Sequence, residues 1–440
     1  MLTAFIRAFR TPDLRKKLLF TLGILVLFRF GATLPTPGID EKAVSYCSGV
    51  AASSSAASVY QIVDLLSGNA LKYISVFALG IMPYITASII LQLLTVVIPR
   101  LETLKNEGQA GQQKITQYTR YLTVGLAILQ STGYIELARS GTLFPGCTEE
   151  VIPSASVFRI ATMVVIMVAG TAVIMWLGEL ITDRGVGNGM SVLIFTQVIA
   201  VIPGELLSVY QTKGTFIALI AIIVIIVIVA FVVFMEQAQR RIPVQYAKRM
   251  VGRRMYGGTS TYIPMKVNQA GVIPVIFGSS LLYIPQLAVS LFGSTSKPQP
   301  WVTWVQTHLE TTDSLSTSWL YFALFFVLTI AFTYFYVSIT FNPTEVADNM
   351  KKYGGFIPGI RPGRPTAEYL GYVLSRLTAP GSLYLGVVAL FPMVALASIG
   401  VGQTFAFSGV SLLIMVGVGL DTVKQIESQL QQRNYEGFLR

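Results

Sequence analysis

Residue types that carry enzyme chemistry are scarce in this chain of 440 residues. Its single histidine is His308, and its two cysteines are Cys47 and Cys147. One imidazole cannot build a histidine metal site, and two thiols exclude a thiolate cluster. The sequence also lacks an HExxH helix and a GxSxG elbow, which are typical of metalloproteases and α/β-hydrolases. We therefore expect no enzyme activity, no metal and no cofactor.

Two further patterns could indicate a nucleotide site or an ion-coupled transporter, but neither fits its expected context. The run RGVGNG at Arg184–Gly189 resembles part of a dinucleotide loop, but it joins two apolar runs with no strand before it. An ion-coupled transporter usually keeps ionisable groups inside the membrane. Here Glu179 and Glu236 fall at the ends of apolar runs. Arg29 is the exception, and we expect it to satisfy carbonyls or another polar group between helices. A pump is therefore disfavoured, whereas a solute facilitator and an intramembrane hydrolase stay open as alternatives.

The apolar run Ile74–Pro99 has an unusual composition for a membrane span. It is long enough to cross a bilayer and has no charge, but Gly80 and Pro83 loosen its backbone. Ile81 and Ile85 lie one helical turn apart, so their branched side chains project from one face. A polar stripe follows at roughly helical spacing: Thr86, Ser88 and Gln92. The run is either a lipid-facing helix with a proline kink or one wall of a conduit whose narrowest point is aliphatic.

The composition predicts a polytopic membrane protein. Soluble domains carry about 25% charged residues, whereas this chain has 12% charged and 53% hydrophobic residues and a mean hydropathy of +0.64. We expect the first apolar run, near Leu18, to be a retained span and not a cleaved signal peptide. Pro203-Gly204 ends the short fifth span. The ten predicted spans cover residues 18–35, 74–98, 118–138, 156–180, 189–204, 215–235, 267–292, 318–341, 367–394 and 405–425.

The positions of lysine and arginine predict the orientation. Most of the 32 basic residues fall before the first span or in the connections that follow even-numbered spans. Few fall on the opposite side: Lys42, Lys72, Arg139, Lys213 and Lys297. Because cytoplasmic segments carry the excess of positive charge, we expect both termini to be cytoplasmic.

The first outward connection, Gly38–Tyr73, contains two unlike pieces. Ala51–Ser58 is rich in serine and alanine, whereas Gln61–Leu71 (QIVDLLSGNAL) is apolar but too short to span. The second piece is either an interfacial helix or a short helix inside an outward-facing funnel. The predicted orientation also places Cys47 and Cys147 outside, where a disulfide can persist. A bridge between them and two unpaired thiols both stay open.

Two long basic loops on the inward side mix cations with apolar residues. Gln237–Met265 shows partial strand-like alternation, and Asn342–Pro365 combines a charged helical turn with Gly/Pro hairpin chemistry. Basic loops commonly set topology or contact anionic lipid. We expect several apolar residues among the cations to be exposed, which favours a docking surface for a large partner: Tyr246, Met255, Tyr256, Phe356 and Ile357.

Several segments resemble the bacterial SecY family, the large subunit of the protein-conducting channel. The resemblance covers nearly the whole chain, but it fails between Glu41 and Gln61, where the Ser/Ala run and Cys47 are unexpected. The segments that carry it are FRFGATLPTPGID at Phe28–Asp40, FALGIMPYITASIILQLL at Phe77–Leu94, ITQYTRY at Ile115–Tyr121, WLGELITDRGVGNGMS at Trp176–Ser191, KVNQAGVIPVIF at Lys266–Phe277 and FIPGIRPG at Phe356–Gly363.

The resemblance implies an all-α polytopic membrane protein with ten transmembrane helices in two five-helix, inverted-repeat halves. Residues 1–204 would form the N-terminal half, including the plug segment 61–71. Residues 205–440 would form the C-terminal half, including the cytoplasmic loops 237–265 and 342–365. The pathway would lie at the interface of the two halves.

The resemblance also assigns roles along that pathway. A ring of branched aliphatic residues can dewet and block ions, and weak polar contacts between helices suit a seam that opens sideways. The pore ring would be Ile81, Ile85, Ile194, Ile276 and Ile414, with Ser280 near it. The plug would include Gln61, Ile62, Asp64, Leu65, Leu66 and Asn69. The lateral gate between the second, third and seventh spans would be formed by Thr86, Gln92, Gln130 and Asn268.

Finally, the resemblance implies a bacterial cytoplasmic-membrane channel that takes its energy from a partner. Secretory polypeptides would cross the membrane, and membrane-protein segments would leave sideways, driven by the SecA motor or the translating ribosome. Both would bind the inward loops, the ribosome through rRNA phosphates. Further partners would be SecE, SecG, signal sequences, nascent chains and anionic lipids. The residues assigned to SecA and the ribosome are Arg253, Arg254, Arg361, Lys351 and Lys352.

Overall fold

The computed structural model describes residues 9, 11–52, 70, 74–139, 147, 151–152, 156–246, 249–251, 254–256, 260–292, 300–309, 319–398 and 409–436. The first half of the chain contains α2 (Pro12–Thr33), α3 (Glu41–Ala52), α5 (Met82–Val97), α6 (Pro99–Asn106), α7 (Gln109–Arg139), α8 (Val157–Arg184) and α9 (Gly189–Lys213). The helices of the second half are α10 (Thr215–Gln237), α11 (Ile273–Phe292), α12 (Pro300–Leu309), α13 (Trp319–Thr340), α14 (Pro343–Lys352), α15 (Arg364–Ser398) and α16 (Gly409–Glu436). The strands are β1 (Gln239–Tyr246), β2 (Arg249–Val251), β3 (Arg254–Tyr256), β4 (Ser260–Lys266) and β5 (Gly355–Phe356).

Each of the ten predicted spans falls on a helix of the described chain: α2, α5, α7, α8, α9, α10, α11, α13, α15 and α16. Within the described residues, six helical segments are long and apolar enough to cross a membrane without a partner segment. A seventh span results if α5 and α6, which meet at an angle of 106°, are taken together. These features confirm the prediction of a mainly helical, multi-pass membrane protein.

The predicted span 74–98 is helical only in its second part. Residues 74–81, which we call the strap, form turns and one isolated bridge between Pro35 and Ser75. The strap needs left-handed backbone at Ile74 (φ 40°) and Gly80 (φ 56°). Pro83 lies in the first turn of α5, where a backbone N–H has no acceptor within the helix, so the N–H that proline lacks is not missed. It therefore starts the helix and does not kink it.

Two other predicted helix ends also differ from the structure. Pro203 does not end the fifth span, because α9 continues through it to Lys213 and is stopped at Gly214, whose φ is 85°. The seventh span was expected from residue 267, but α11 begins at Ile273 after a turn in which Gly271 has a φ of 63°. Asn268 therefore lies in the connection before the helix.

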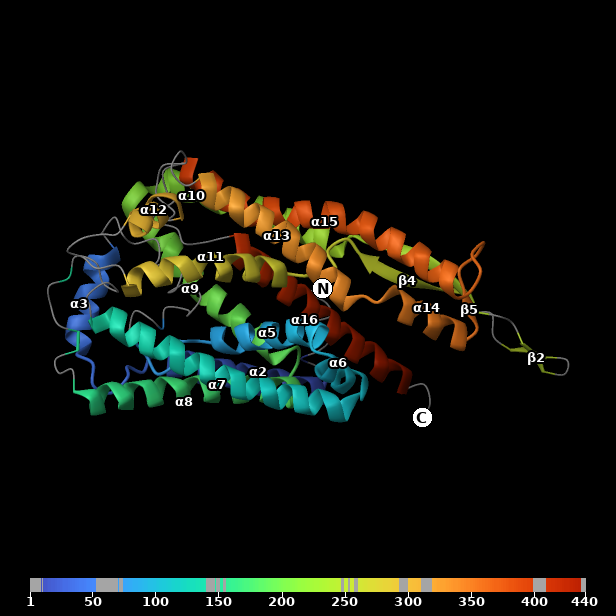
Figure 1. Cartoon of the computed structure of the whole chain (residues 1–440), viewed down its shortest axis with the longest axis horizontal. Coiled ribbons are helices and arrows are strands. Elements are labelled where there is room, and N and C mark those ends of the chain that lie inside the picture. The colour runs from blue at the N-terminus through green and yellow to red at the C-terminus, as the bar shows by residue number, and fades with distance from the viewer. Residues whose placement is uncertain are drawn as a thin grey trace.

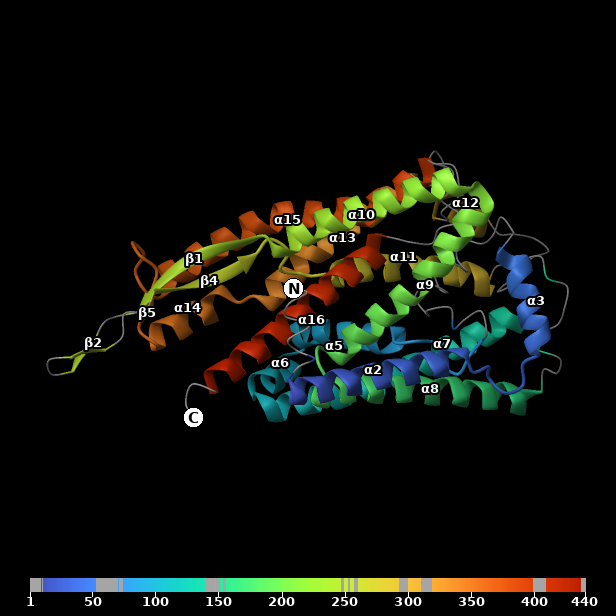
Figure 2. The ribbon, with the colours of Figure 1, turned by 180° about the vertical axis from the view of Figure 1, so that it is seen from behind.

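The helices form two stacks with a central group between them (Figures 1 and 2). α7 packs between α5 and α8, and α2 lies along α8. On the opposite side, α13 packs against α11 and α15, and α10 also contacts α15. The stacks meet where α9 packs on α16 and α10, and where α11 approaches α7. Four helices therefore lie at the centre: α5, α9, α11 and α16.

A small antiparallel sheet extends the second stack at one end of the molecule (Figure 1). Its strand order is β4-β1-β5, with a register from Gln239 opposite Lys266 to Gln245 opposite Ser260. Ile242 and Val244 of β1 are buried, Ile242 in a cluster with residues of α15, whereas their neighbours in the strand face solvent. This confirms the strand-like alternation in the Gln237–Met265 loop, because one face of an antiparallel sheet covers the core.

Candidate functional site

Five isoleucines lie in two packed clusters, four of them on the central helices and Ile81 at the end of the strap just before α5, and we call these residues the isoleucine waist. They are Ile81, Ile85, Ile194, Ile276 and Ile414. Ile81 is 1% exposed and Ile414 is 4% exposed, and the other three are half-buried. Ile194 of α9 packs against both clusters, so it joins Ile81 and Ile85 on one side to Ile276 and Ile414 on the other. All five are therefore at least partly covered by other side chains.

Close packing of the strap fixes the start of α5 and with it the position of Ile81. The Thr36 hydroxyl donates to the carbonyl of Ile74 at 2.7 Å, and the Val76 amide donates to the carbonyl of Leu34 at 2.9 Å. Phe77 stacks on Phe28 with ring centroids 6.0 Å apart. The Phe77 ring fills the space beside Gly31, where an added Cβ would come within 2.1 Å of it. These contacts fasten the strap to α2.

The four predicted lateral-gate residues lie on or beside α5, α7 and α11, but their hydrogen bonds in the structure do not join those helices. The Thr86 hydroxyl donates to the carbonyl of Met82 in its own helix. Gln92 is exposed and Gln130 is half-buried. Asn268 is buried, and its Nδ2 donates to Glu236 Oε1 at 2.6 Å and to the carbonyl of Gly271 at 3.3 Å. The lateral-gate role of these residues stays a prediction.

The structure pairs ionisable groups that the sequence showed only separately. Arg120 of α7 makes a bidentate ion pair with Glu179 of α8, with Nε–Oε1 and Nη2–Oε2 distances of 2.9 and 2.7 Å. Lys266 at the end of β4 lies 3.5 Å from Asp421 of α16. These pairs cross between elements far apart in sequence. The only available signal was that Arg120, Glu179 and Glu236 fall at span ends, where charge is tolerated.

The loop Asn342–Pro365 forms a compact turn that presents Arg361 to solvent. Gly359 and Gly363 have φ values of 82° and 105°, which only glycine adopts easily. The Thr366 hydroxyl donates to the Arg361 carbonyl at 2.9 Å and closes the turn. The prediction of an exposed Ile357 was wrong, because it is buried with Leu370 of α15. Anchored on this apolar contact, the turn leaves the Arg361 side chain exposed.

The other predicted loop residues lie on several elements. Lys351 and Lys352 are exposed in the last turn of α14, where positive charge also favours the helix dipole. Tyr246 is 36% exposed at the end of β1, and Phe356 is half-buried in β5. Arg254 lies in β3. Arg253 lies outside the described residues, as do the plug residues Gln61, Ile62, Asp64, Leu65, Leu66 and Asn69. Ser280 lies in α11 but has no described side chain.

A disulfide joins Cys47 to Cys147 at the opposite end of the molecule. Their Cα atoms are 5.3 Å apart, which confirms the bridged alternative. Asp40 caps α3 by accepting from the Lys42 amide at 2.9 Å, and its own amide donates to the carbonyl of Val151 at 3.3 Å. Cys47 is fully buried, in a cluster that includes Met163 of α8. α3 is therefore fastened to the α7–α8 connection at two points.

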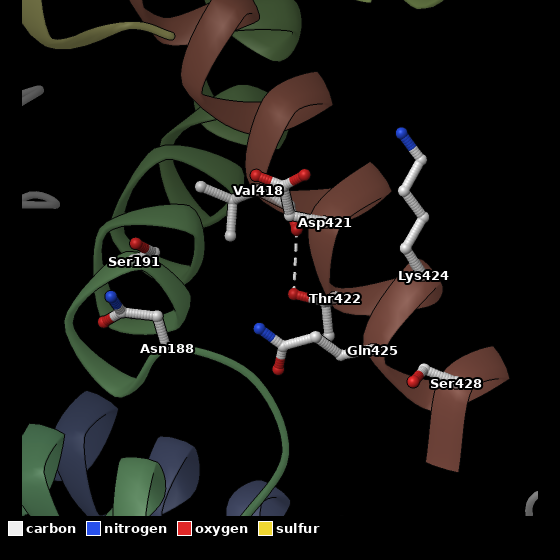
Figure 3. Close-up of a pocket in the computed structure, with 8 residues that line it drawn as sticks. All are labelled: Asn188, Ser191, Val418, Asp421, Thr422, Lys424, Gln425 and Ser428. Carbon is white, nitrogen blue, oxygen red and sulfur yellow. Dashed lines mark hydrogen bonds between the residues drawn. The ribbon is translucent and has the colours of Figure 1, made fainter. Parts of the chain in front are cut away.

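A polar pocket of about 420 Å³ lies between the start of α9 and α16 (Figure 3). Asn188 caps α9 by accepting from the Met190 amide at 3.2 Å, and Gly187 supplies a φ of 91°. The run RGVGNG is thus a short turn between α8 and α9, and not a dinucleotide loop, as its lack of a preceding strand predicted. Gln425 extends from α16 toward Asn188, and the Thr422 hydroxyl donates to the Val418 carbonyl. The pocket lies where the two halves of the chain meet.

Comparison with known proteins supplies the family. Residues 75–423 match the SecY family model. The chain is 63% identical over 446 residues to the protein translocase subunit SecY of Streptomyces scabiei, with 100% of both chains covered. It is 58% identical over 446 residues to the corresponding subunit of Mycobacterium tuberculosis, again with 100% of both covered.

The fold also matches solved channel structures. One, described as "The structure of a protein conducting channel", has a TM-score of 0.63 at 18% identity and covers 94% of this chain and 91% of its own. Another, "Sec61 in the Canine ribosome-channel complex from the endoplasmic reticulum", has a TM-score of 0.60 at 17% identity, with 94% and 91% covered. At such identities these structures support the fold alone.

The full-length relatives confirm the resemblance drawn from the sequence segments. They support neither a solute facilitator nor an intramembrane hydrolase, because each is a channel-type translocase subunit. The chain therefore belongs to the SecY family of protein translocase subunits.

Proposed function

We propose that the isoleucine waist is the gated constriction of a passive conduit for unfolded polypeptides. The observation that supports this most directly is the packing of all five isoleucines into two clusters that share Ile194. A narrow aliphatic ring dewets and blocks small ions. It also gives a passing polypeptide no polar group to bind, so the chain is not retained. Ser280 would lie near this ring.

The two halves, residues 1–204 and 205–440, would separate to open the conduit. Packing of α9 on α16 and approach of α11 to α7 support an interface at the centre of the bundle. Residues 61–71 would close the outer side as a plug. Thr86, Gln92, Gln130 and Asn268 would border the lateral opening through which membrane-protein segments leave.

We further propose that the sheet and both termini face the cytoplasm of a bacterial cell. The exposed cations Arg361, Lys351 and Lys352 support this orientation, because positive charge accumulates on the cytoplasmic side. The Cys47–Cys147 disulfide at the opposite end also supports it, since disulfides persist outside the cytoplasm.

The energy for transport would come from a partner that binds this basic end. SecA and the ribosome are the proposed partners, and one structural relative is described as a ribosome–channel complex. Exposed cations on a rigid turn suit both rRNA phosphates and an acidic protein face. SecE and SecG would complete the channel, and anionic lipid would contact the remaining basic residues.

Crosslinking of a stalled secretory chain tests the conduit. A photo-crosslinking residue is placed at each position of the isoleucine waist, and at Val165 of α8 as a control, because Val165 is 65% exposed on the outside of the bundle. We expect the stalled chain to crosslink at the waist and not at Val165. Equal crosslinking at both would overturn the assignment.

A further inference from the structure

A polar cluster lies beside the connection between β4 and α11, and the constriction of the conduit leaves its hydrogen bonds unexplained. We call Glu236, Asn268 and Tyr384 the junction cluster. We propose that these three side chains enclose one buried water and act together as positioning residues that hold the start of α11. The inference extends the proposed gate, because α11 carries Ile276 of the waist.

Three elements bring the junction cluster together. Glu236 lies one turn after Val232 on α10, so it is on the same side of the helix as this buried residue, which belongs to a cluster that also includes Tyr384 and Leu385. α15 approaches the connection so closely that a Cβ on Gly381 would lie 2.4 Å from the carbonyl oxygen of Val267. Tyr384 follows Gly381 by one turn, on the same side of α15.

Further contacts place the Tyr384 ring beside α10. The ring centroids of Tyr384 and Phe231 are 6.0 Å apart. A Cβ on Gly381, one turn before Tyr384, would also lie 3.9 Å from the Cα of Asn268. Asn268 already donates to the Glu236 carboxylate at 2.6 Å. Tyr384 therefore lies beside both α10, which carries Glu236, and the connection that carries Asn268.

Two buried oxygen atoms in this cluster have no hydrogen-bond partner among the described residues. They are Asn268 Oδ1 and the Tyr384 hydroxyl, in side chains that are 4% and 5% exposed. Buried polar groups are nearly always paired, and leaving one unpaired is costly. The two unpaired atoms thus point to a missing hydrogen-bonding partner of small size.

Donor and acceptor counting identifies that partner as water. A water molecule can donate to Asn268 Oδ1 and to the second Glu236 oxygen, while it accepts from the Tyr384 O–H. Three hydrogen bonds are typical of a buried water. A monovalent cation could contact the same three oxygens, but it would leave the Tyr384 proton without an acceptor.

The junction cluster lies where the basic hairpin meets the waist. The Val267 amide donates to the Ala238 carbonyl at 3.0 Å and continues the pairing of β1 with β4. Gly271 then turns the chain into α11, and Ile276 follows within the first turn of that helix. A partner that moves the hairpin would therefore act on α11 through this connection.

Hydrogen exchange on the full chain in lipid vesicles tests the proposal. The variants are Glu236→Gln, which replaces an acceptor by a donor, and Tyr384→Phe, which removes one hydroxyl. We expect amides 267–272 to exchange about tenfold faster in Glu236→Gln and about fivefold faster in Tyr384→Phe, because charge-assisted hydrogen bonds are stronger than neutral ones. Tyr384→Phe keeps the test available if Glu236→Gln lowers the yield.

Matched controls use the same chemistry at exposed sites. Glu107→Gln changes a carboxylate that is about half exposed, and Tyr372→Phe changes an exposed tyrosine of the same helix as Tyr384. We expect neither to alter exchange at amides 267–272. Acceleration by a control equal to that of its partner variant would overturn the proposal.

The double variant separates a shared water from two independent contacts. If one water links both side chains, Glu236→Gln with Tyr384→Phe accelerates exchange little beyond Glu236→Gln alone. If the two effects multiply, the shared water is wrong. A further measurement replaces sodium and potassium by choline. If the exchange rate at amides 267–272 changes in either direction, a bound cation occupies the site, and the shared water is wrong.

The link to gating is measured separately as ion leak from the same vesicles. We expect Glu236→Gln to raise the leak about tenfold, in proportion to the exchange at the junction. Faster exchange without added leak would overturn the gating role. A wild-type channel that passes no polypeptide would instead overturn the proposed function, and the exchange result would still decide the junction cluster.

Discussion

The two ends of the molecule are stabilised by different means. At the α3 end, a disulfide and a buried apolar cluster fasten one helix to the α7–α8 connection. At the sheet end, backbone pairing between β1 and β4 and two left-handed glycines fix the shape, while Arg361, Lys351 and Lys352 stay exposed. At the α3 end, side chains are used mainly for internal contacts that stabilise the fold. The sheet end leaves its cations accessible to a partner.

The largest effect should follow charge reversal at the sheet end. Arg361→Glu should reduce motor-dependent export at least about 100-fold, because a like charge placed against a complementary surface costs several kcal/mol. Membrane assembly should be unchanged, since the turn is closed by the Arg361 carbonyl and not by its side chain. Export into vesicles measures the loss.

The control for this prediction is Arg139→Glu, a reversal at the end of α7 on the opposite side of the bundle. Arg139 is half exposed and pairs only weakly with Glu136 at 3.6 Å. If both reversals reduce export equally, the two ends do not differ in partner binding.

At the α3 end, loss of the disulfide should affect stability more than export. Replacing Cys47 and Cys147 together by serine should lower the free energy of unfolding by roughly 4 kcal/mol, because the bridge closes a loop of 100 residues. Thermal unfolding measures this change. Wild-type protein treated with reductant should behave like the variant, and a melting curve that does not respond to reductant would contradict the prediction.

A core substitution tests how the sheet is attached. Ile242→Ala should lower the free energy of unfolding by about 3 kcal/mol, because Ile242 is 1% exposed and packs with Leu370 and Val373. Thermal unfolding measures the loss of stability, and limited proteolysis of the hairpin measures how firmly the sheet is attached. Arg240→Ala, on the exposed face of β1, serves as the control and should leave both measurements unchanged.

The smallest effect should come from an exposed ion pair at the same end. Glu368→Gln removes the partner of Arg364, 3.0 Å away, but both side chains are mostly exposed. Such pairs contribute little because water and salt screen them. No change in thermal unfolding is expected, and a clear drop would show that surface charge also stabilises this end.

Much of the helical arrangement could be predicted because span-length apolar runs and turn residues carry local signals. The strand alternation around Ile242 and the tight turn at Arg361 were predicted for the same reason. Pro83 and Pro203 misled because a proline alone does not say whether it starts a helix, ends one or lies within it. Tertiary packing settled each case.

The contacts between distant elements could not be predicted. Cys47 and Cys147 lie 100 residues apart, so the sequence left their pairing open. Glu236 and Asn268 meet only because the hairpin returns its second strand beside the end of α10. Ile357 looked exposed within a basic loop, yet α15 covers it. The sequence pattern shows which side chains are apolar, but it does not show which helix or strand will pack against them.

The strap has a consequence for how the bilayer is crossed. With 16 residues, α5 is only about 24 Å long, less than the roughly 30 Å of hydrocarbon. The strap must cover the remaining depth, where irregular backbone is tolerated only if lipid cannot reach it. α8 provides that shielding, because Gly170 lets its backbone touch the Val76 carbonyl. This part of the bundle is thus a helix shorter than the hydrocarbon core that is completed by a sheltered loop, and a larger residue at position 170 would expose unpaired peptide groups to lipid.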